Sequence, residues 1–128
     1  MRRGRAGFAL LEAAIAAAIV SLAAVATLAA FGAEVRTGIR ARDALRAAAL
    51  AEERLATVRL LPTEDLRLLP DSVRRGRFAP PFEGYGWEAS ARTVPEQEGL
   101  VEVSVRVEWE GGAYSLRTRL YRPPPRTQ

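Results

Sequence analysis

Two features near the start of the chain have residue types and spacing that could support chemistry. Glu12 is the only charged residue between Phe8 and Ala33. An isolated charge in hydrocarbon costs about 2.5 kcal/mol or more, so this carboxylate either has a positive partner or lies hydrated at headgroup depth beside the basic leader. The second feature is the junction Gly7-Phe8, where a small residue meets a bulky one ahead of the apolar run. Secretory signal peptides are cleaved after their apolar core, so any processing here follows a different rule.

The element that positions both features is an apolar helix over residues 8–33. It contains no proline, and its length of about 39 Å is enough to cross a hydrocarbon layer of about 30 Å. A basic leader, residues 1–7, comes first and carries Arg2, Arg3 and Arg5. Positive charge on a short segment favours the cytoplasmic side, so the sequence predicts a single membrane pass with a cytoplasmic leader and an exported remainder.

The helix is predicted to continue over residues 34–61 as an amphipathic segment outside the membrane. Pro62 ends it, because proline lacks a backbone N–H and disfavours helical geometry in the preceding residue. Charged residues, Arg54 among them, occupy the water-exposed faces. Alanine is abundant along the helix, which fits either close helix packing in lipid or helix propensity alone. The predicted packing stripe, spaced by three and four, is Ala41, Ala44, Ala48, Ala51, Leu55 and Val58.

Residues 62–84 break this periodicity and are predicted to form a variable loop with one short helix. Thr63 is the expected N-cap of that helix, with Leu66 and Leu69 facing inward. The basic cluster Arg74-Arg75-Gly76-Arg77 is predicted to be a solvated loop, and the alternative is a ligand patch.

Over residues 85–122 the apolar period changes to two, which predicts a three-stranded antiparallel meander. Trp87 begins the first strand, and alternating valines from Val101 to Val107 mark the second. Residues 123–128 include three consecutive prolines and are predicted to be a loose tail.

The last hairpin has a predicted register. A primed two-residue turn at Gly111-Gly112 would place Trp109 opposite Tyr114 and Val107 opposite Leu116. In this register the apolar residues of both strands share one face. Glu108 would then lie diagonal to Arg117 on the polar face.

A small sheet with one apolar face needs a cover, and the only long apolar stripe available is that of the exported helix. The sequence therefore predicts an α+β fold. In it a long N-terminal helix, membrane-spanning in its first half, packs on a small three-stranded antiparallel sheet.

Composition excludes several kinds of site. The chain has no cysteine and no histidine, which removes disulfides, thiolate metal sites and the commonest general base. The net charge is +4, but without the three leader arginines 16 arginines face 15 acidic residues, a net charge of +1. A nucleic-acid footprint over the exported part is therefore not supported. The carboxylates are scattered without a nucleophile and base, so we expect no metal, cofactor, small-molecule ligand or enzymatic activity.

The string Gly7-Phe8-Ala9-Leu10-Leu11-Glu12, after a basic leader and before about twenty apolar residues, resembles the processing signal of type IV pilins and type II secretion pseudopilins. Ala9 departs mildly from that pattern, in which threonine is more common. The resemblance implies that a prepilin peptidase cuts between Gly7 and Phe8 and methylates the new amine of Phe8. It also implies that Glu12 pairs with the N-terminal amine of a neighbouring subunit in a filament, and that the fold is pilin-like.

Within this family the chain is most similar to the GspI group of minor pseudopilins. The later motifs that carry the similarity are Ala51-Glu52-Glu53-Arg54-Leu55, Trp87 at the start of the first strand, and the run from Val103 to Trp109 before a glycine hairpin. The aspartate-rich calcium loop of major pseudopilins has no counterpart, since Asp71 is the last aspartate.

The resemblance to the GspI group implies a structural role in protein secretion. The partners would be GspJ-like and GspK-like minor pseudopilins, the major pseudopilin, the prepilin peptidase and the inner membrane, with the C-terminal domain in the periplasm. Two alternatives remain at this point. One is a PilV-like minor pilin of a type IV pilus, and the other is a competence-type minor pilin that binds DNA through Arg74, Arg75 and Arg77.

Overall fold

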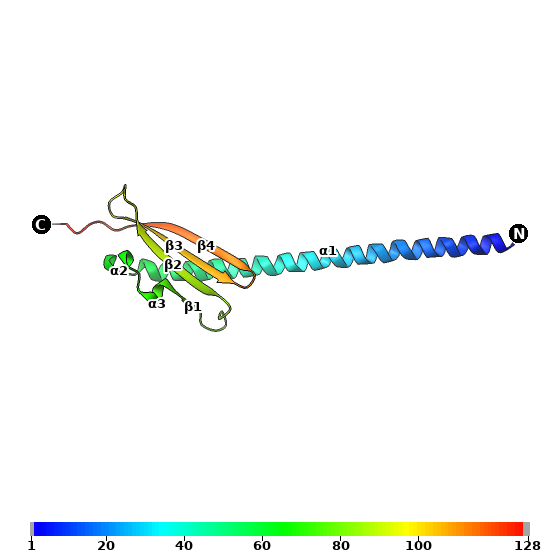
Figure 1. Ribbon diagram of the computed structural model, residues 1–128, viewed down its shortest axis with the longest axis horizontal. Helices are drawn as coiled ribbons and strands as arrows, with labels where there is room; N and C mark the ends of the chain where they lie inside the picture. Colours follow the sequence, from blue (N-terminus) through cyan, green and yellow to red (C-terminus); the bar gives the residue numbers. More distant parts are fainter. Residues whose placement is uncertain (1, 127–128) are drawn as a thin grey trace. The chain divides into compact units, whose positions relative to one another are not determined.

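The computed structural model describes residues 2–126, with side chains from residue 5 onward. The chain divides into two compact units, one up to residue 39 and one from residue 40. The elements in chain order are α1 (Arg2–Arg59), α2 (Thr63–Arg67), α3 (Asp71–Arg74), β1 (Arg75–Arg77), β2 (Gly86–Thr93), β3 (Leu100–Trp109) and β4 (Gly112–Tyr121) (Figure 1).

The first unit consists of the part of helix α1 up to residue 39. Every side chain from residue 5 to residue 31 is exposed, and by length and composition this helix can cross a membrane. The two hydroxyl groups of this segment are satisfied within the helix, since the Ser21 hydroxyl donates to the Ala17 carbonyl at 2.7 Å and the Thr27 hydroxyl to the Ala23 carbonyl at 2.8 Å. Internal hydrogen bonds of this kind are what a helix in hydrocarbon requires. The prediction of a long apolar N-terminal helix is confirmed.

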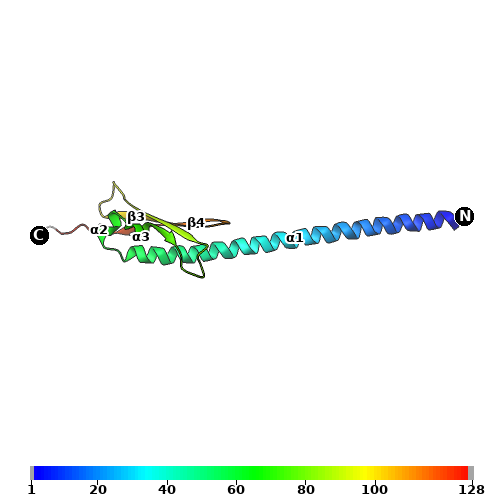
Figure 2. The same ribbon diagram turned by 60° about the horizontal axis from the view of Figure 1, so that its bottom comes forward.

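The second unit is an antiparallel sheet packed on the C-terminal part of α1, which confirms the α+β class. The two ribbon views show β2, β3 and β4 lying along this part of the helix, with the helix on one face of the sheet (Figures 1 and 2). The strand order is β1-β2-β3-β4. The predicted count of three strands is wrong, because residues 75–77 form a fourth strand at one edge.

Strand β1 lies in the segment predicted to be a loop, and it depends on one close approach. Gly76 pairs with Trp87 of β2, and a Cβ on Gly76 would lie 2.6 Å from two atoms of the Trp87 indole. Only glycine leaves room for the ring at this position. The sequence Arg-Gly-Arg shows no apolar alternation, so local periodicity could not reveal the strand.

The core lies between α1 and the sheet. Ala51, Leu55 and Val58 of the predicted stripe are buried, Ala44 and Ala48 are half-buried, and Ala41 is exposed. The helix also buries Ala47 and Leu50, which are not part of the predicted stripe. A broad sheet faces the helix, so more than one residue per turn is buried. The buried core residues are Ala47, Leu50, Ala51, Leu55, Val58, Leu66, Leu69, Phe78, Ala89, Val101, Val103, Val105 and Val107.

The β3–β4 register differs from the predicted one by two residues. Val107 pairs with Tyr114 and Trp109 with Gly112, so Glu110 and Gly111 form the turn. The turn is also not of the primed kind, since Gly99 is the one residue with positive φ within the described range. The indole of Trp109 explains the shift, because one of its atoms lies 3.2 Å from a Cβ built on Gly112, so glycine as the pairing residue leaves room for the ring. A shift of two preserves the faces, so the inward valines are still those predicted.

Two short helices connect α1 to the sheet. α2 begins at Thr63, and Pro62 is the N-cap without a side-chain hydrogen bond, so the predicted Thr63 cap is wrong. Leu66 is buried as predicted. The end of α1 is held from the far end of the sheet, where Arg122 Nη2 donates to the Arg59 and Leu61 carbonyls. A guanidinium at this position satisfies carbonyls that the helix itself leaves unpaired.

Candidate functional site

Phe8, predicted for processing, and Glu12, predicted for assembly, lie on one face of the apolar helix. Phe8, Leu11, Glu12, Ile15 and Ile19 line a shallow groove on α1, because residues three and four apart are neighbours on a helix surface. Phe8 is 75% exposed and the neighbouring leucine and isoleucines are more than half exposed. The structure therefore places a carboxylate within an uncovered apolar face.

Glu12 forms no ion pair with any other side chain that the structure describes. Arg5 is the leader arginine with a described side chain, and it lies seven residues away, about 10 Å along the helix. The side chains of Arg2 and Arg3 lie outside the described residues. This arrangement can accept a positive group from another molecule, since the exposed groove is open on the side of the carboxylate.

Gly7 is not required by packing within the chain. A Cβ built on this residue meets no atom within 4 Å, and Gly7 lies inside α1, where glycine costs about 1 kcal/mol relative to alanine. The fold thus offers no reason for glycine at this position.

A cluster of aromatic rings and one arginine joins α1 to the sheet, and sequence reasoning missed it. The Arg54 guanidinium lies 3.6 Å from the ring centroid of Trp87 and 5.2 Å from that of Phe78. The Trp87 Nε1 donates to the Val73 carbonyl at 3.0 Å. The prediction that Arg54 faces water is wrong, because its side chain is half-buried and its charge stacks on the two rings.

A second contact between α1 and the sheet side links Tyr85 to Asp43. The Tyr85 hydroxyl donates to Asp43 Oδ1 at 3.3 Å. Partial burial, followed by the nearby Asp43 charge and this hydrogen bond, raises the pKa of Tyr85 above its ordinary value, and Arg46 opposes the change. The contact ties the loop before β2 to the helix.

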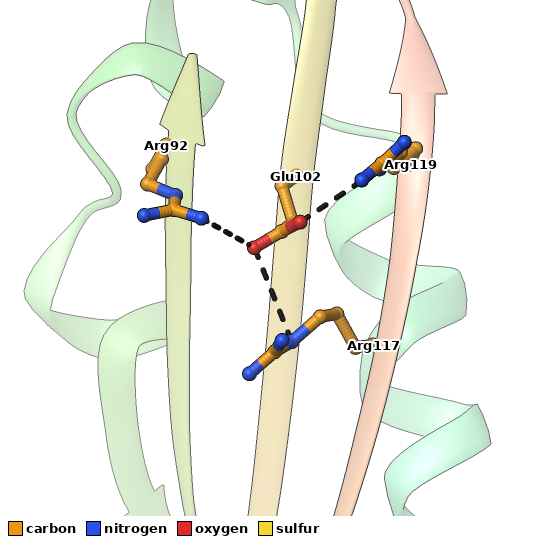
Figure 3. Close-up of polar contacts among 4 residues, drawn as sticks. All are labelled: Arg92, Glu102, Arg117 and Arg119. Carbon is orange, nitrogen blue, oxygen red and sulfur yellow. Dashed lines mark hydrogen bonds and ion pairs between the residues drawn. The ribbon is translucent and has the colours of Figure 1, made fainter. Parts of the chain in front are cut away.

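The outer face of the sheet carries a cluster of three arginines around one carboxylate (Figure 3). Arg92 Nη2 donates to Glu102 Oε1 at 3.0 Å, while Arg117 Nε and Arg119 Nε lie 3.9 and 3.8 Å from the same carboxylate. The Glu102 side chain is 14% exposed and the three arginines are 64–75% exposed. The predicted diagonal contact of Glu108 with Arg117 is absent among the described ion pairs, and Glu108 instead pairs with Arg106 at 2.6 Å.

The basic cluster proposed as an alternative DNA contact is divided between two elements. Arg74 ends α3 and lies 3.9 Å from Asp71, while Arg77 Nη1 donates to the Glu83 carbonyl at 3.3 Å. Arg75 and Arg77 are exposed in β1. Within the described residues, no group of three or more acidic side chains is placed to hold a metal ion.

The chain was compared with protein-family models, with curated proteins and with solved structures. None of the three comparisons finds a match.

Proposed function

We propose that the chain is an assembly subunit of a pilin-like filament, a minor pseudopilin similar to the GspI group of type II secretion systems. The observation that carries this proposal is the uncovered apolar face of α1 around Glu12. A soluble domain would leave such a surface exposed to water at high cost. Lipid covers it before assembly, and other helices cover it in a filament.

The Glu12 carboxylate would make this face specific for a helix that carries a free N-terminal amine. Cleavage between Gly7 and Phe8 would create an amine at the cytoplasmic edge of the membrane, one helical turn from Glu12. When a processed neighbour docks, its amine meets this carboxylate and neither charge stays unpaired in a medium of low dielectric constant. The pairing sets the axial position of one helix against the next, and the small residues of α1 let the helices approach closely.

The folded second unit would supply contacts to particular partners, for which we propose GspJ-like and GspK-like subunits in the periplasm. The role is assembly in the inner membrane rather than catalysis. A minor pilin of a type IV pilus shares the same N-terminal chemistry, and the identity of the cross-linked neighbours in the experiment below distinguishes the two systems.

The proposal is tested by the variant Glu12→Ala, with Glu34→Ala as the matched control. A photo-cross-linking residue at Ile15 would report on helices packed against the groove in membranes of the native host. We expect adducts with pilin-like subunits in the wild type and in Glu34→Ala, and their loss in Glu12→Ala while cleavage continues. Undiminished adducts in Glu12→Ala would overturn the role of the carboxylate.

Processing is tested separately through Gly7→Ile, with Gly32→Ile as its control. Neither glycine has an atom within 4 Å of a built Cβ, so both side chains fit the fold equally well. We expect the mass of the mature wild-type chain and of the control to correspond to a start at Phe8 with one added methyl group, and the Gly7 variant to keep its leader. A fully active wild-type chain that retains residues 1–7 would contradict the filament proposal.

A further inference from the structure

Strand β4 is a free edge of the sheet. It has 10 residues and, within the described part of the chain, pairs only with β3. The other edge, β1, has 3 residues. A strand that pairs on one side leaves a row of backbone N–H and C=O groups along its other side, which can hydrogen-bond to another extended segment.

The inner face of β4 is apolar apart from Thr118, and it is incompletely covered. Tyr114, Leu116 and Leu120 are half-buried, whereas Val103 and Val105 of the neighbouring strand are fully buried. Helix α1 thus covers the centre of the sheet better than this edge. An added strand would shield these side chains with its own apolar residues.

The outer face of the same edge is basic. Arg117 and Arg119 alternate along β4, and neither donates a hydrogen bond to another described residue, although both lie within 4 Å of Glu102. Each guanidinium has five N–H donors, and one carboxylate shared with Arg92 cannot satisfy them. The cluster of Glu102 and its three arginines carries two positive charges in excess, which favour carboxylates on a partner.

We infer that the β4 edge binds an extended peptide segment in which apolar and acidic residues alternate. Backbone pairing along the edge would place the apolar residues of the segment beside Tyr114, Leu116 and Leu120. Its acidic residues would then stand on the outer face beside Arg117 and Arg119, because neighbouring strands keep residues of one face together.

Two other ligands, a second copy of this chain and a nucleic acid, match the β4 edge less well than the acidic peptide does. Pairing of two β4 edges would bring arginines together, and β1 is also basic through Arg75 and Arg77, so like charges oppose sheet-to-sheet pairing of copies. A nucleic acid could use the arginines, but it would use neither the edge backbone nor the apolar row beneath it.

The inference is tested with the full chain in detergent micelles and a labelled peptide of five valine–glutamate repeats, whose length matches the 10 residues of β4. The comparison peptide has lysine in place of glutamate. The binding variant is Arg117→Glu/Arg119→Glu, and the matched control is Arg106→Glu, on the same face in β3 with a half-exposed side chain.

We expect the wild type to bind the glutamate peptide in a salt-dependent manner and the lysine peptide at least about tenfold more weakly. The double variant should reverse this preference, which also shows that it is folded, and Arg106→Glu should keep it. Methylation of every backbone nitrogen of the peptide should abolish binding, because it removes the donors that pair with the edge.

Three results would overturn the inference. They are equal affinity for the two peptides, unchanged binding of the methylated peptide, and displacement of the peptide by a single-stranded oligonucleotide at equal concentration. The inference uses only the second unit, so Glu12→Ala should bind the peptide like the wild type. A failure here is therefore distinguishable from a failure of the filament proposal.

Discussion

At the scale of single residues, the packing of Trp87 shows how one side chain can organise several elements. Its ring lies against Phe78, with 4.9 Å between ring centroids, and beneath the Arg54 guanidinium. Its Nε1 hydrogen bond to Val73 reaches the short helix before β1. Since Gly76 lies directly against the indole, the position of β1 depends on the absence of a side chain there.

We predict that Gly76→Ala destabilises the second unit by about 1–3 kcal/mol, because the new methyl group forces a packed ring to move. Gly84→Ala is the control, since a Cβ on Gly84 meets no atom within 4 Å, and its effect should stay within about 0.5 kcal/mol. Urea unfolding of the full chain in detergent, followed by tryptophan fluorescence, measures both. Equal free energies of unfolding for the two variants would show that the indole can move aside without destabilising the fold.

The Tyr85–Asp43 contact predicts a pH dependence. The pKa of Tyr85 is raised in the folded state, so above its unfolded value of about 10 the folded chain holds a proton that the unfolded chain has released. The stabilisation is complete below that pH and is lost as pH rises through the folded-state pKa.

We therefore expect the wild type to lose more free energy of unfolding between about pH 8.5 and pH 10.5 than Tyr85→Phe does. The phenylalanine variant keeps the ring and lacks the titrating hydroxyl, which makes it the appropriate control. Parallel curves for the two proteins would exclude a contribution from this tyrosine.

At the scale of elements, the β3–β4 hairpin illustrates the difference between face and register. Alternation along each strand decides which residues face inward, and a shift of two leaves that choice unchanged. The turn residues decide the register, and the Trp109 ring over Gly112 favours Glu110-Gly111 over the glycine pair as the turn.

A pair of engineered cysteines distinguishes the two registers in a chain that has none of its own. Arg106 pairs with Ser115 in the structure, so Arg106→Cys/Ser115→Cys should form a disulfide on mild oxidation. In Arg106→Cys/Arg117→Cys the two residues are diagonal, at about 7–8 Å, which is beyond ordinary disulfide geometry. Intact mass after oxidation and alkylation measures the bond, and preferential oxidation of the second pair would favour the register expected from the glycine pair.

At the scale of the whole molecule, the chain joins a helix that can cross a membrane to a folded α+β unit. We predict that Leu22→Arg/Val25→Arg greatly reduces membrane retention, since each arginine at the centre of the apolar helix costs about 2.5–3.5 kcal/mol. The control is Leu60→Arg/Leu68→Arg, two leucines that are also exposed, at 87% and 80%, but lie in the second unit. Alkaline extraction of membranes followed by immunoblotting measures the retained fraction, and equal retention of the two variants would contradict a spanning role for α1.

Local pattern was sufficient for much of this molecule. The apolar run with Glu12 inside it follows from composition, the end of the helix before Pro62 from the geometry of proline, and the inward valines of β3 from a period of two. All three depend only on neighbours along the chain. Gly7, Phe8 and Glu12 were singled out by their order relative to the apolar core and by a family resemblance, and their roles in processing and assembly stay predictions. These features need no knowledge of what lies opposite them in space.

Tertiary structure decided the features that depend on a distant partner. β1 exists because Gly76 meets Trp87, Arg54 leaves the water-exposed face because two rings offer it a surface, and Glu102 gathers arginines from β2 and β4. In each case the stabilising contacts join segments that are far apart in the sequence. A local periodic pattern cannot reveal such contacts. The α+β class was therefore determined by sequence alone, while the fourth strand, the register and the basic edge of β4 were determined only by the fold.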